Sequence, residues 1–263
     1  MTLASCGGSK DNPWNPDWDK PNPTEPTDPD NPDFIGKPRY VWIDAAANFS
    51  DYENNKERIA SDLQKIKDVG FTDIIVDVRP TSGDVLFKSS VAQPLKKVDV
   101  WKGSNYVWVS RTGTYDYLQA FVEEARKVGL RVNASINTFV GGYLCPYGLG
   151  NDGMLFREPE KKSWASVINS SNGLTNVMDL NGPDDWGTRF LNPANEQVQN
   201  YVLQIIKDLA KYDLDGIILD RCRYDDYGLQ SDFSDVSKNK FEAYSGLSIS
   251  SWPDDVLALG TTE

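Results

Sequence analysis

The stretch LNPANEQVQNYVLQIIKDLAKYDLDGIILDRCRYDD, from Leu191 to Asp226, decides the fold of this chain. Asn192 can cap a helix and Pro193 suits a first helical turn, so the pair predicts a helix start. Apolar residues then recur at helical spacing, at Val198, Tyr201, Val202, Ile205 and Leu209. The apolar run at 216–219 predicts a short buried strand that ends at Asp220. A helix, a short turn and a buried parallel strand followed by charged groups is typical of an α/β barrel.

The same alternation of strand and helix precedes this stretch. Strands are predicted at 40–43, 73–76 and 131–136, and the helices between them end at Gly70 and Gly129. Long loops follow the second and third strands, at 81–111 and from 137 to 190. Alternation of this kind predicts parallel strands with right-handed crossovers. A doubly wound sheet is the alternative, but no GxGxxG pattern follows the first strand.

We therefore predict an α/β fold of the (β/α)8 TIM-barrel type. Four βα units occupy residues 40–225, and the remaining segment is too short for four more. A fourth helix is expected to begin near 241–244, whereas 257–259 is too short to assign. The expectation is that residues 37–263 hold about four units, the N-terminal half of a barrel.

The amino-acid composition limits the partners and the catalytic groups that this chain can use. The net charge of the 263-residue chain is −12 and no cluster of Lys and Arg stands out, which disfavours nucleic acids and anionic membrane surfaces as partners. The absence of His removes Ser-His-Asp and Cys-His systems and His-ligated metals, so Asp and Glu are the main acid-base groups. No metal or cofactor is expected. Of the three cysteines, Cys145 and Cys222 are expected to be free thiols, with a disulfide between them as the less favoured alternative.

The N-terminus carries a different kind of signal. Leu3-Ala4-Ser5-Cys6 matches the lipobox of bacterial lipoproteins, in which the Cys carries the lipid. Residues 1–6 are predicted to be the remnant of a lipoprotein signal peptide, and the Pro-, Asp- and Asn-rich residues 7–36 a disordered tether. The expected location is the bacterial cell envelope, lipid-anchored to the outer membrane through Cys6. A chance match of four residues is the alternative.

Three motifs resemble a known family. They are Val78-Arg79-Pro80 followed by Asp84, Leu191-Asn192-Pro193, and YDLDGI at 212–217 with Asp220 and Tyr224. Together they resemble the glycosyl-hydrolase-like family 10, a group of bacterial (β/α)8-barrel proteins, many of them lipoproteins. The resemblance runs from about Pro38 to the C-terminus and implies glycoside hydrolysis, with bacterial cell-wall glycan as a substrate class. Asp-Gly-x-x-x-Asp at 215–220 is also similar to the α-amylase clan, in which the final Asp is the nucleophile.

This chain departs from the family pattern at two strand ends. The third strand of the family usually ends in a His-Ala-Trp-type sequence before Asn, whereas residues 133–137 read NASIN. The fourth strand is often followed by Asp-Asp-Tyr, whereas here Asp220 is followed by Arg221 and Cys222.

Glycosidases use two carboxyl groups, one to protonate the leaving oxygen and one as nucleophile or base. We predict Asp220 as the nucleophile or stabilising carboxylate, with a structural Asp paired to Arg221 or Arg223 as the alternative. The internal candidates for the acid are Asp225, Asp226 and Glu158, although related barrels often take it from a later strand.

Five further residues are predicted to contact substrate because they end strands or follow Asp220: Asp44, Arg79, Asn137, Arg223 and Tyr224. Asp44 and Asn137 could equally cap the helices that follow their strands, and Arg79 could form an ion pair with Asp77 or Asp44. Tyr224, Trp108 and Trp186 could stack on sugar rings, with core packing as the alternative for each Trp.

Two functions remain open at this point. The first is a surface-anchored glycoside hydrolase acting on a polysaccharide. The second is a catalytically inactive carbohydrate-binding surface lipoprotein on the same scaffold, because a fold does not fix a function. A metal-dependent hydrolase is disfavoured because the sequence shows no clustered ligands.

Overall fold

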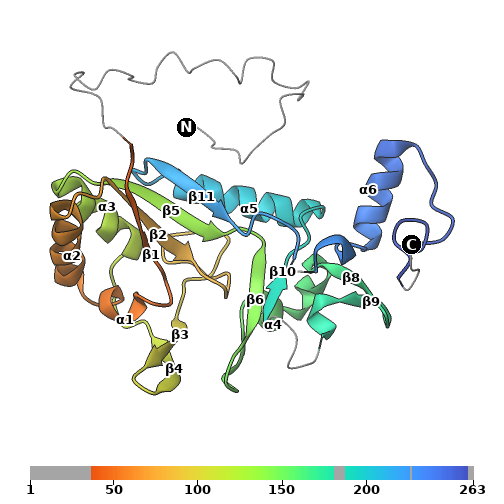
Figure 1. Ribbon diagram of the computed structural model, residues 1–263, viewed down its shortest axis with the longest axis horizontal. Coiled ribbons are helices and arrows are strands. Elements are labelled where there is room, and N and C mark those ends of the chain that lie inside the picture. The colour runs from red at the N-terminus through yellow and green to blue at the C-terminus, as the bar shows by residue number, and fades with distance from the viewer. Residues whose placement is uncertain (1–36, 181–186, 226, 260–263) are drawn as a thin grey trace, which may run out of the picture.

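A computed structural model describes residues 37–180, 187–225 and 227–259 of the chain (Figure 1). Cys6, the predicted tether at 7–36, Trp186 and Asp226 lie outside the described residues. Four parallel strands form the main sheet in the order β1 (Tyr40–Ile43), β2 (Asp73–Arg79), β5 (Arg131–Asn137) and β11 (Gly216–Asp220). These are the four strands that the hydrophobic runs predict, and they lie side by side in chain order.

Three helices alternate with these strands: α2 (Lys56–Asp68), α3 (Tyr117–Lys127) and α5 (Glu196–Leu209). Their apolar stripes share one core with the side chains of every second residue of the strands, such as Ile74, Val76 and Val132. The helices gather on one side of the sheet in Figure 1. The opposite face of the sheet is therefore free to carry polar side chains.

The predicted carboxyl ends of α2 and α3 are confirmed, whereas the predicted cap of α5 is not. The glycines expected to end α2 and α3 do so, with left-handed φ angles of 92° at Gly70 and 68° at Gly129. The prediction that Asn192 caps α5 is wrong, because the Asn195 side chain accepts the cap hydrogen bond from the Gln197 N–H at 2.8 Å. Asn192 is instead buried, and its amide donates to Asp232 at 2.7 Å.

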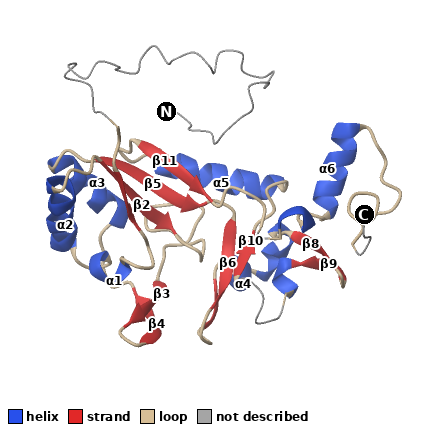
Figure 2. Ribbon diagram, viewed as in Figure 1, coloured by secondary structure: helices blue, strands red, loops and turns tan. Residues whose placement is uncertain are grey.

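The two segments expected to be long loops contain small sheets (Figure 2). After β2 comes the hairpin of β3 (Lys97–Lys102) and β4 (Asn105–Ser110). After β5, a three-stranded antiparallel sheet joins β6 (Val140–Cys145) to β7 (Gly150–Asp152) and β10 (Thr188–Phe190), and β8 (Val167–Ser170) pairs with β9 (Gly173–Asn176).

Short helices complete the described part. They are α1 (Phe49–Tyr52), α4 (Met154–Arg157), the 3-10 turns Pro159–Trp164, Val177–Asp179 and Gly228–Gln230, and α6 (Asp235–Ser245). The fourth helix begins earlier than the start expected near 241–244, because Ser234 caps α6 at Asp235. Within the described residues, no helix is long and apolar enough to cross a bilayer.

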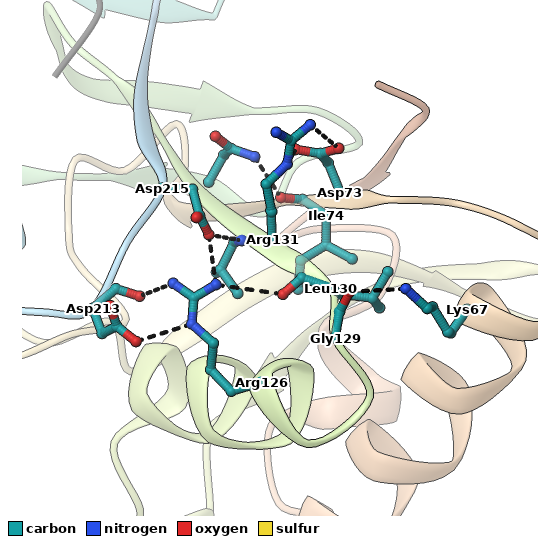
Figure 3. A network of polar contacts seen from close by, with 11 residues as sticks. Lys67, Asp73, Ile74, Arg126, Gly129, Leu130, Arg131, Asp213 and Asp215 are labelled. Atoms are coloured by element: carbon teal, nitrogen blue, oxygen red, sulfur yellow. Dashed lines mark hydrogen bonds and ion pairs between the residues drawn. The ribbon is translucent and has the colours of Figure 1, made fainter. Parts of the chain in front are cut away.

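The amino ends of the strands are held by a charged network (Figure 3). Arg126 of α3 pairs with Asp213 at 2.9 Å and with Asp215 at 2.7 Å. Asp215 also accepts the Val132 N–H at 2.7 Å, and Arg131 forms a two-bond pair with Asp73, both at 2.8 Å. The acidic residues of the YDLDG motif therefore fasten α3 to the turn before β11, at the end of the sheet opposite Asp220.

Candidate active site

The carboxyl ends of the strands bring three acidic side chains to the polar face of the sheet. Because Ile43 is in register with Val76, Asp44 comes level with Asp77 on the neighbouring strand. Asp77 is in register with Ser135 of β5, and Asp220 with Asn137 two residues further along. Side chains two residues apart on a strand share a face, so these positions converge on one edge.

Asp77 is the most perturbed of these groups. Only 8% of the residue is exposed. The pKa of its carboxyl is raised to about 7, chiefly by burial and then by the negative charges of Asp44 and Asp220, while the backbone N–H groups of Arg79 and Ala45 oppose the rise. Asp77 is thus a carboxyl that keeps its proton close to neutral pH, next to two acidic neighbours.

Asp220 lies exposed at the end of β11. One carboxylate oxygen accepts the N–H of Arg221 at 2.7 Å, and its backbone carbonyl accepts from Thr138 at 2.7 Å. Arg221 has a φ of 45°, a region that non-glycine residues rarely occupy and that is often found at functional sites. The Arg221 guanidinium donates to the Thr188 hydroxyl at 3.0 Å, so it is directed toward β10.

Asp44 and Asn137 lie at the strand ends and also form hydrogen bonds with nearby backbone groups. Asp44 accepts the N–H groups of Ala46 at 2.8 Å and Ala47 at 2.7 Å, which closes the turn after β1. Its residue remains exposed, whereas Asn137 is buried and its amide donates to the Arg79 carbonyl at 3.2 Å. The helix-capping alternative is wrong for both residues: Asp44 closes the turn before α1, whose N-cap position is Asn48, and Asn137 joins β5 to the end of β2.

Arg79 differs from its predicted role. The residue is 0% exposed, and its guanidinium donates to the backbone carbonyls of Asn137 and, at 2.8 Å, Val140. Its terminal nitrogens bond to backbone carbonyls rather than to the carboxylates of Asp77 or Asp44, so the ion-pair alternative is wrong, and its complete burial leaves no surface for a substrate to contact. Arg79 is a structural clamp between the ends of β2 and β5.

The internal candidates for an acid partner are tied into local structure. Glu158 pairs with Lys161 at 2.7 Å. Asp225 is 5% exposed and accepts from the Tyr227 N–H at 3.0 Å and the Ser231 hydroxyl at 2.6 Å. The structure does not bring these two beside Asp220 as free carboxyl groups.

The predicted residues after β11 lie on the surface. Tyr224 is 44% exposed, and burial of its hydroxyl end raises its pKa. The Arg223 guanidinium lies 5.3 Å from the ring centre of Phe190 and donates to the Tyr224 carbonyl at 3.1 Å.

Trp108 of β4 is half-buried, and the Lys97 ammonium lies 3.6 Å from its ring centre.

A second carboxyl with a raised pKa belongs to the loop after β2. Burial raises the pKa of Asp84 to about 6 even though Arg157 pairs with it at 2.5 Å and with Asp152 at 2.6 Å. These residues line a pocket of about 240 Å³ together with Lys97. A larger cavity of about 670 Å³ lies on the helical side, between α3 and α5, away from the strand ends.

Asp77 is the site residue that sequence reasoning missed. It appeared only as an ion-pair partner for Arg79. The signal was present in the strand sequence DIIVDVR at 73–79, where an acidic residue interrupts an apolar run at the face opposite the core. Within the described residues, no cluster of acidic, His or Cys side chains has the arrangement of a metal site, and Cys145 and Cys222 are both free.

Comparison with known proteins agrees with this architecture. An S-layer-related protein from Niallia circulans is 30% identical over 227 residues, 84% of this chain but 13% of that protein. The solved alpha-L-fucosidase isoenzyme 2 from Paenibacillus thiaminolyticus superposes with a TM-score of 0.52 at 17% identity, over 81% of this chain and 27% of its own. That likeness shows a shared α/β fold.

A GH36 alpha-galactosidase, AgaA from Geobacillus stearothermophilus, also aligns, with a TM-score of 0.40 at 12% identity over 70% of this chain and 21% of its own. The chain therefore spans only a small part of the length of these relatives. The sequence profile of the family described as Glycosyl hydrolase-like 10 matches residues 37–258, which is most of the chain. The chain belongs to the glycosyl hydrolase-like 10 family.

Proposed function

We propose that this protein is a glycoside hydrolase whose site lies at the carboxyl ends of β1, β2, β5 and β11, and that these units form part of a (β/α)8 barrel. The observation that carries the proposal is the convergence of Asp44, Asp77 and Asp220 on one edge of the sheet, with their charges acting on one another. Parallel α/β barrels place their chemistry at this edge. Family membership supports a glycan as the substrate.

In the proposed mechanism, Asp220 is the nucleophile or the stabilising carboxylate. It approaches the anomeric carbon as the glycosidic C–O bond breaks, or stabilises the positive charge that develops there. The leaving oxygen needs a proton at the same moment. Asp77 has a pKa of about 7, so it retains a proton near neutral pH and is our candidate donor.

This division of roles follows a general pattern for paired carboxyl groups. Two neighbouring acids do acid and base chemistry when their surroundings push their pKa values apart. Asp77 is 8% exposed, and its burial raises its pKa in the direction that a proton donor requires, whereas Asp220 is exposed to solvent.

The alternative is a catalytically inactive carbohydrate-binding lipoprotein. The observation that favours it is the engagement of Glu158 and Asp225 in local hydrogen bonds and ion pairs, which leaves Asp77 as the internal candidate for the acid within the part of the chain that the structure describes. In that case the same exposed groups, Asp44, Asp220 and Tyr224, would hold sugar hydroxyls and rings without turnover.

We also propose that Cys6 is acylated and anchors the protein to the outer membrane, where bacterial cell-wall glycan would be within reach. The lipobox and the composition of residues 7–36 support this proposal. Incorporation of labelled palmitate by the protein expressed with its native signal, and loss of label in Cys6→Ser, is expected. A protein that takes up no label would refute the anchor.

Product release from purified glycans tests the proposed function. The full protein, Asp220→Asn and Asp77→Asn are incubated with peptidoglycan and a panel of plant and host polysaccharides, and an exposed acid far from the site, Asp254→Asn, serves as the matched control. Release by the parent and the control, but not by Asp220→Asn, is expected. Equal release by Asp220→Asn removes Asp220 from the mechanism, and binding without release by any variant favours the carbohydrate-binding alternative.

A further inference from the structure

An exposed aromatic cluster lies beyond the strand ends, on residues that the site does not use. Trp101 of β3, Tyr106 of β4 and Tyr147 of the β6–β7 turn contact one another, with all three pairs of ring centres 5.2 Å apart. Trp101 is 59% exposed and Tyr147 is 71% exposed. Large aromatic surfaces kept in water usually mark a binding site.

A buried carboxylate holds the cluster in place. Asp99 of β3 is 6% exposed and accepts the hydroxyl groups of Tyr106, at 2.8 Å, and of Tyr143 on β6. It thereby joins the β3–β4 hairpin to the β6–β7 hairpin. Both hairpins extend below the main sheet in Figure 1, so two separate excursions of the chain are fixed together.

A second contact joins the same two hairpins. Trp108 of β4 donates from its indole nitrogen to the Leu149 carbonyl in the β6–β7 turn, at 3.4 Å. Tyr147, two residues earlier, has a left-handed φ of 56°, which non-glycine residues adopt rarely. The rings are therefore presented by anchored backbone rather than by a loose loop tip.

The residues that support the cluster lie beside the turns that follow β1 and β2. A cavity of about 30 Å³ is lined by Asp99 and Tyr143, and also by Ala46, which follows β1, and by the Pro80–Ser82 turn after β2. The base of the two hairpins thus touches the turns that follow Asp44 and Arg79. A chain that passes over the strand ends could continue onto the rings.

The size and surroundings of the cluster indicate its occupant. The two most exposed residues, Trp101 and Tyr147, together present roughly 300 Å² if each contributes on the order of 150 Å². A stable protein interface needs about 800 Å² on each partner, so the patch is too small for one. Exposed polar residues, Lys102, Ser104 and Asn105, flank the rings and could bind hydroxyl groups.

We propose that Trp101, Tyr106 and Tyr147 form a platform that stacks on sugar rings of a polymeric glycan, outside the hydrolytic site. The apolar C–H face of a pyranose ring covers an aromatic face while its hydroxyl groups reach the polar rim. The platform holds long chains and adds nothing to the cleavage of a short substrate. This inference rests on the proposed function for its ligand class.

Co-sedimentation with insoluble glycans tests the platform. The full protein carrying Asp220→Asn, which cannot consume its ligand, is mixed with peptidoglycan sacculi, chitin, cellulose and granular starch. Trp101→Ala with Tyr147→Ala is expected to weaken binding on the order of tenfold or more. Trp101→Phe keeps a ring and is expected to bind nearly as the parent.

Two controls separate binding from folding. Tyr244→Ala removes a ring on α6 that is even more exposed, at 91%, and is expected to leave binding unchanged. Thermal unfolding of each variant shows whether the fold persists. If Trp101→Ala lowers the melting temperature, the binding of the single variant Tyr147→Ala is compared with that of the parent instead. Equal binding by the Ala variants and the parent, or no binding by the parent to any of the four polymers, would overturn the platform.

The outcomes distinguish the platform from the hydrolytic site. In an otherwise unmodified protein, loss of polymer binding with unchanged cleavage of soluble oligosaccharides supports both proposals. Unchanged polymer binding with cleavage intact overturns the platform alone. Polymer binding that depends on Trp101 and Tyr147, without release of any product, supports the platform and overturns hydrolysis.

Discussion

The buried carboxyl of Asp77 gives a prediction whose size can be worked out. Its pKa is raised from an ordinary value of 3.8 to about 7, first by burial and then by the charge of Asp44. The native state therefore holds a proton on Asp77 that the unfolded chain releases. Stability from this group is fully present below about pH 4 and is lost as the pH rises through about 7.

Replacing Asp77 by Asn removes the ionisation and keeps a similar shape. The two pKa values imply that the parent is less stable than Asp77→Asn by about 2 kcal/mol at pH 5 and by about 4 kcal/mol at pH 8. Solvent screening reduces this free-energy difference little, because Asp77 is only 8% exposed. The same change should abolish turnover if Asp77 donates the proton, so stability and activity move in opposite directions.

Urea unfolding at pH 5 and pH 8 measures the difference. Other titrating groups, including Asp84, are common to both proteins and largely cancel. Asp254→Asn, an exposed acid, is expected to track the parent at both pH values. The difference in the free energy of unfolding between the parent and Asp77→Asn is expected to grow from pH 5 to pH 8. A difference that is the same at both pH values, or smaller at pH 8, would refute the raised pKa of Asp77 and with it the acid role.

Three further predictions concern the scaffold and are checked by denaturant unfolding. Arg126→Ala removes two ion pairs and is expected to cost about 2 kcal/mol of stability, whereas an equal midpoint would contradict the role of the network. Gly153→Ala places a Cβ 2.2 Å from the Cα of Gly142 at a φ of 120°, and should cost at least about 3 kcal/mol or prevent folding. Asn195→Ala removes the cap of α5 and should cost about 1 kcal/mol, so a change below a few tenths would argue against that cap.

The sequence predicted the central sheet well because its signals are local. The apolar runs at 73–76 and 216–219 indicate strands, and glycines such as Gly70 end helices by their own conformational freedom. The first run is buried as expected, whereas the prediction of a buried strand at 216–219 is wrong, because β11 lies at the edge of the sheet and is only half-buried. The parallel direction of the strands followed from the alternation of strands and helices. The hairpin at 97–110 was missed although VDVW and YVWV are typical strand sequences, because a barrel was expected to place loops there.

The site was predicted in part, for a physical reason. Asp44, Asn137 and Asp220 end strands, so their position follows from element boundaries alone. The roles of Asp77 and Arg79 depend instead on which neighbours surround them after folding. Burial beside Asp44 raises the pKa of Asp77, and the backbone carbonyls of Asn137 and Val140 accept hydrogen bonds from Arg79. Neither neighbour can be identified from spacing along the chain.

The aromatic cluster illustrates the same limit. Trp101 and Tyr147 are far apart in sequence, and they meet only because Asp99 and Trp108 join two hairpins. An accumulation of Trp and Tyr in a chain is compatible with core packing or with exposed platforms, and exposure decides between them.

Chemical rescue of an Asp220 variant tests the central claim most directly. Asp220→Ala removes the carboxylate, and turnover of whichever glycan the parent cleaves should fall on the order of a thousandfold or more. Added sodium formate or azide can occupy the vacated space, and we predict that it restores part of the rate while leaving Asp254→Asn unaffected. A variant that keeps the parent rate without any added anion would contradict the account.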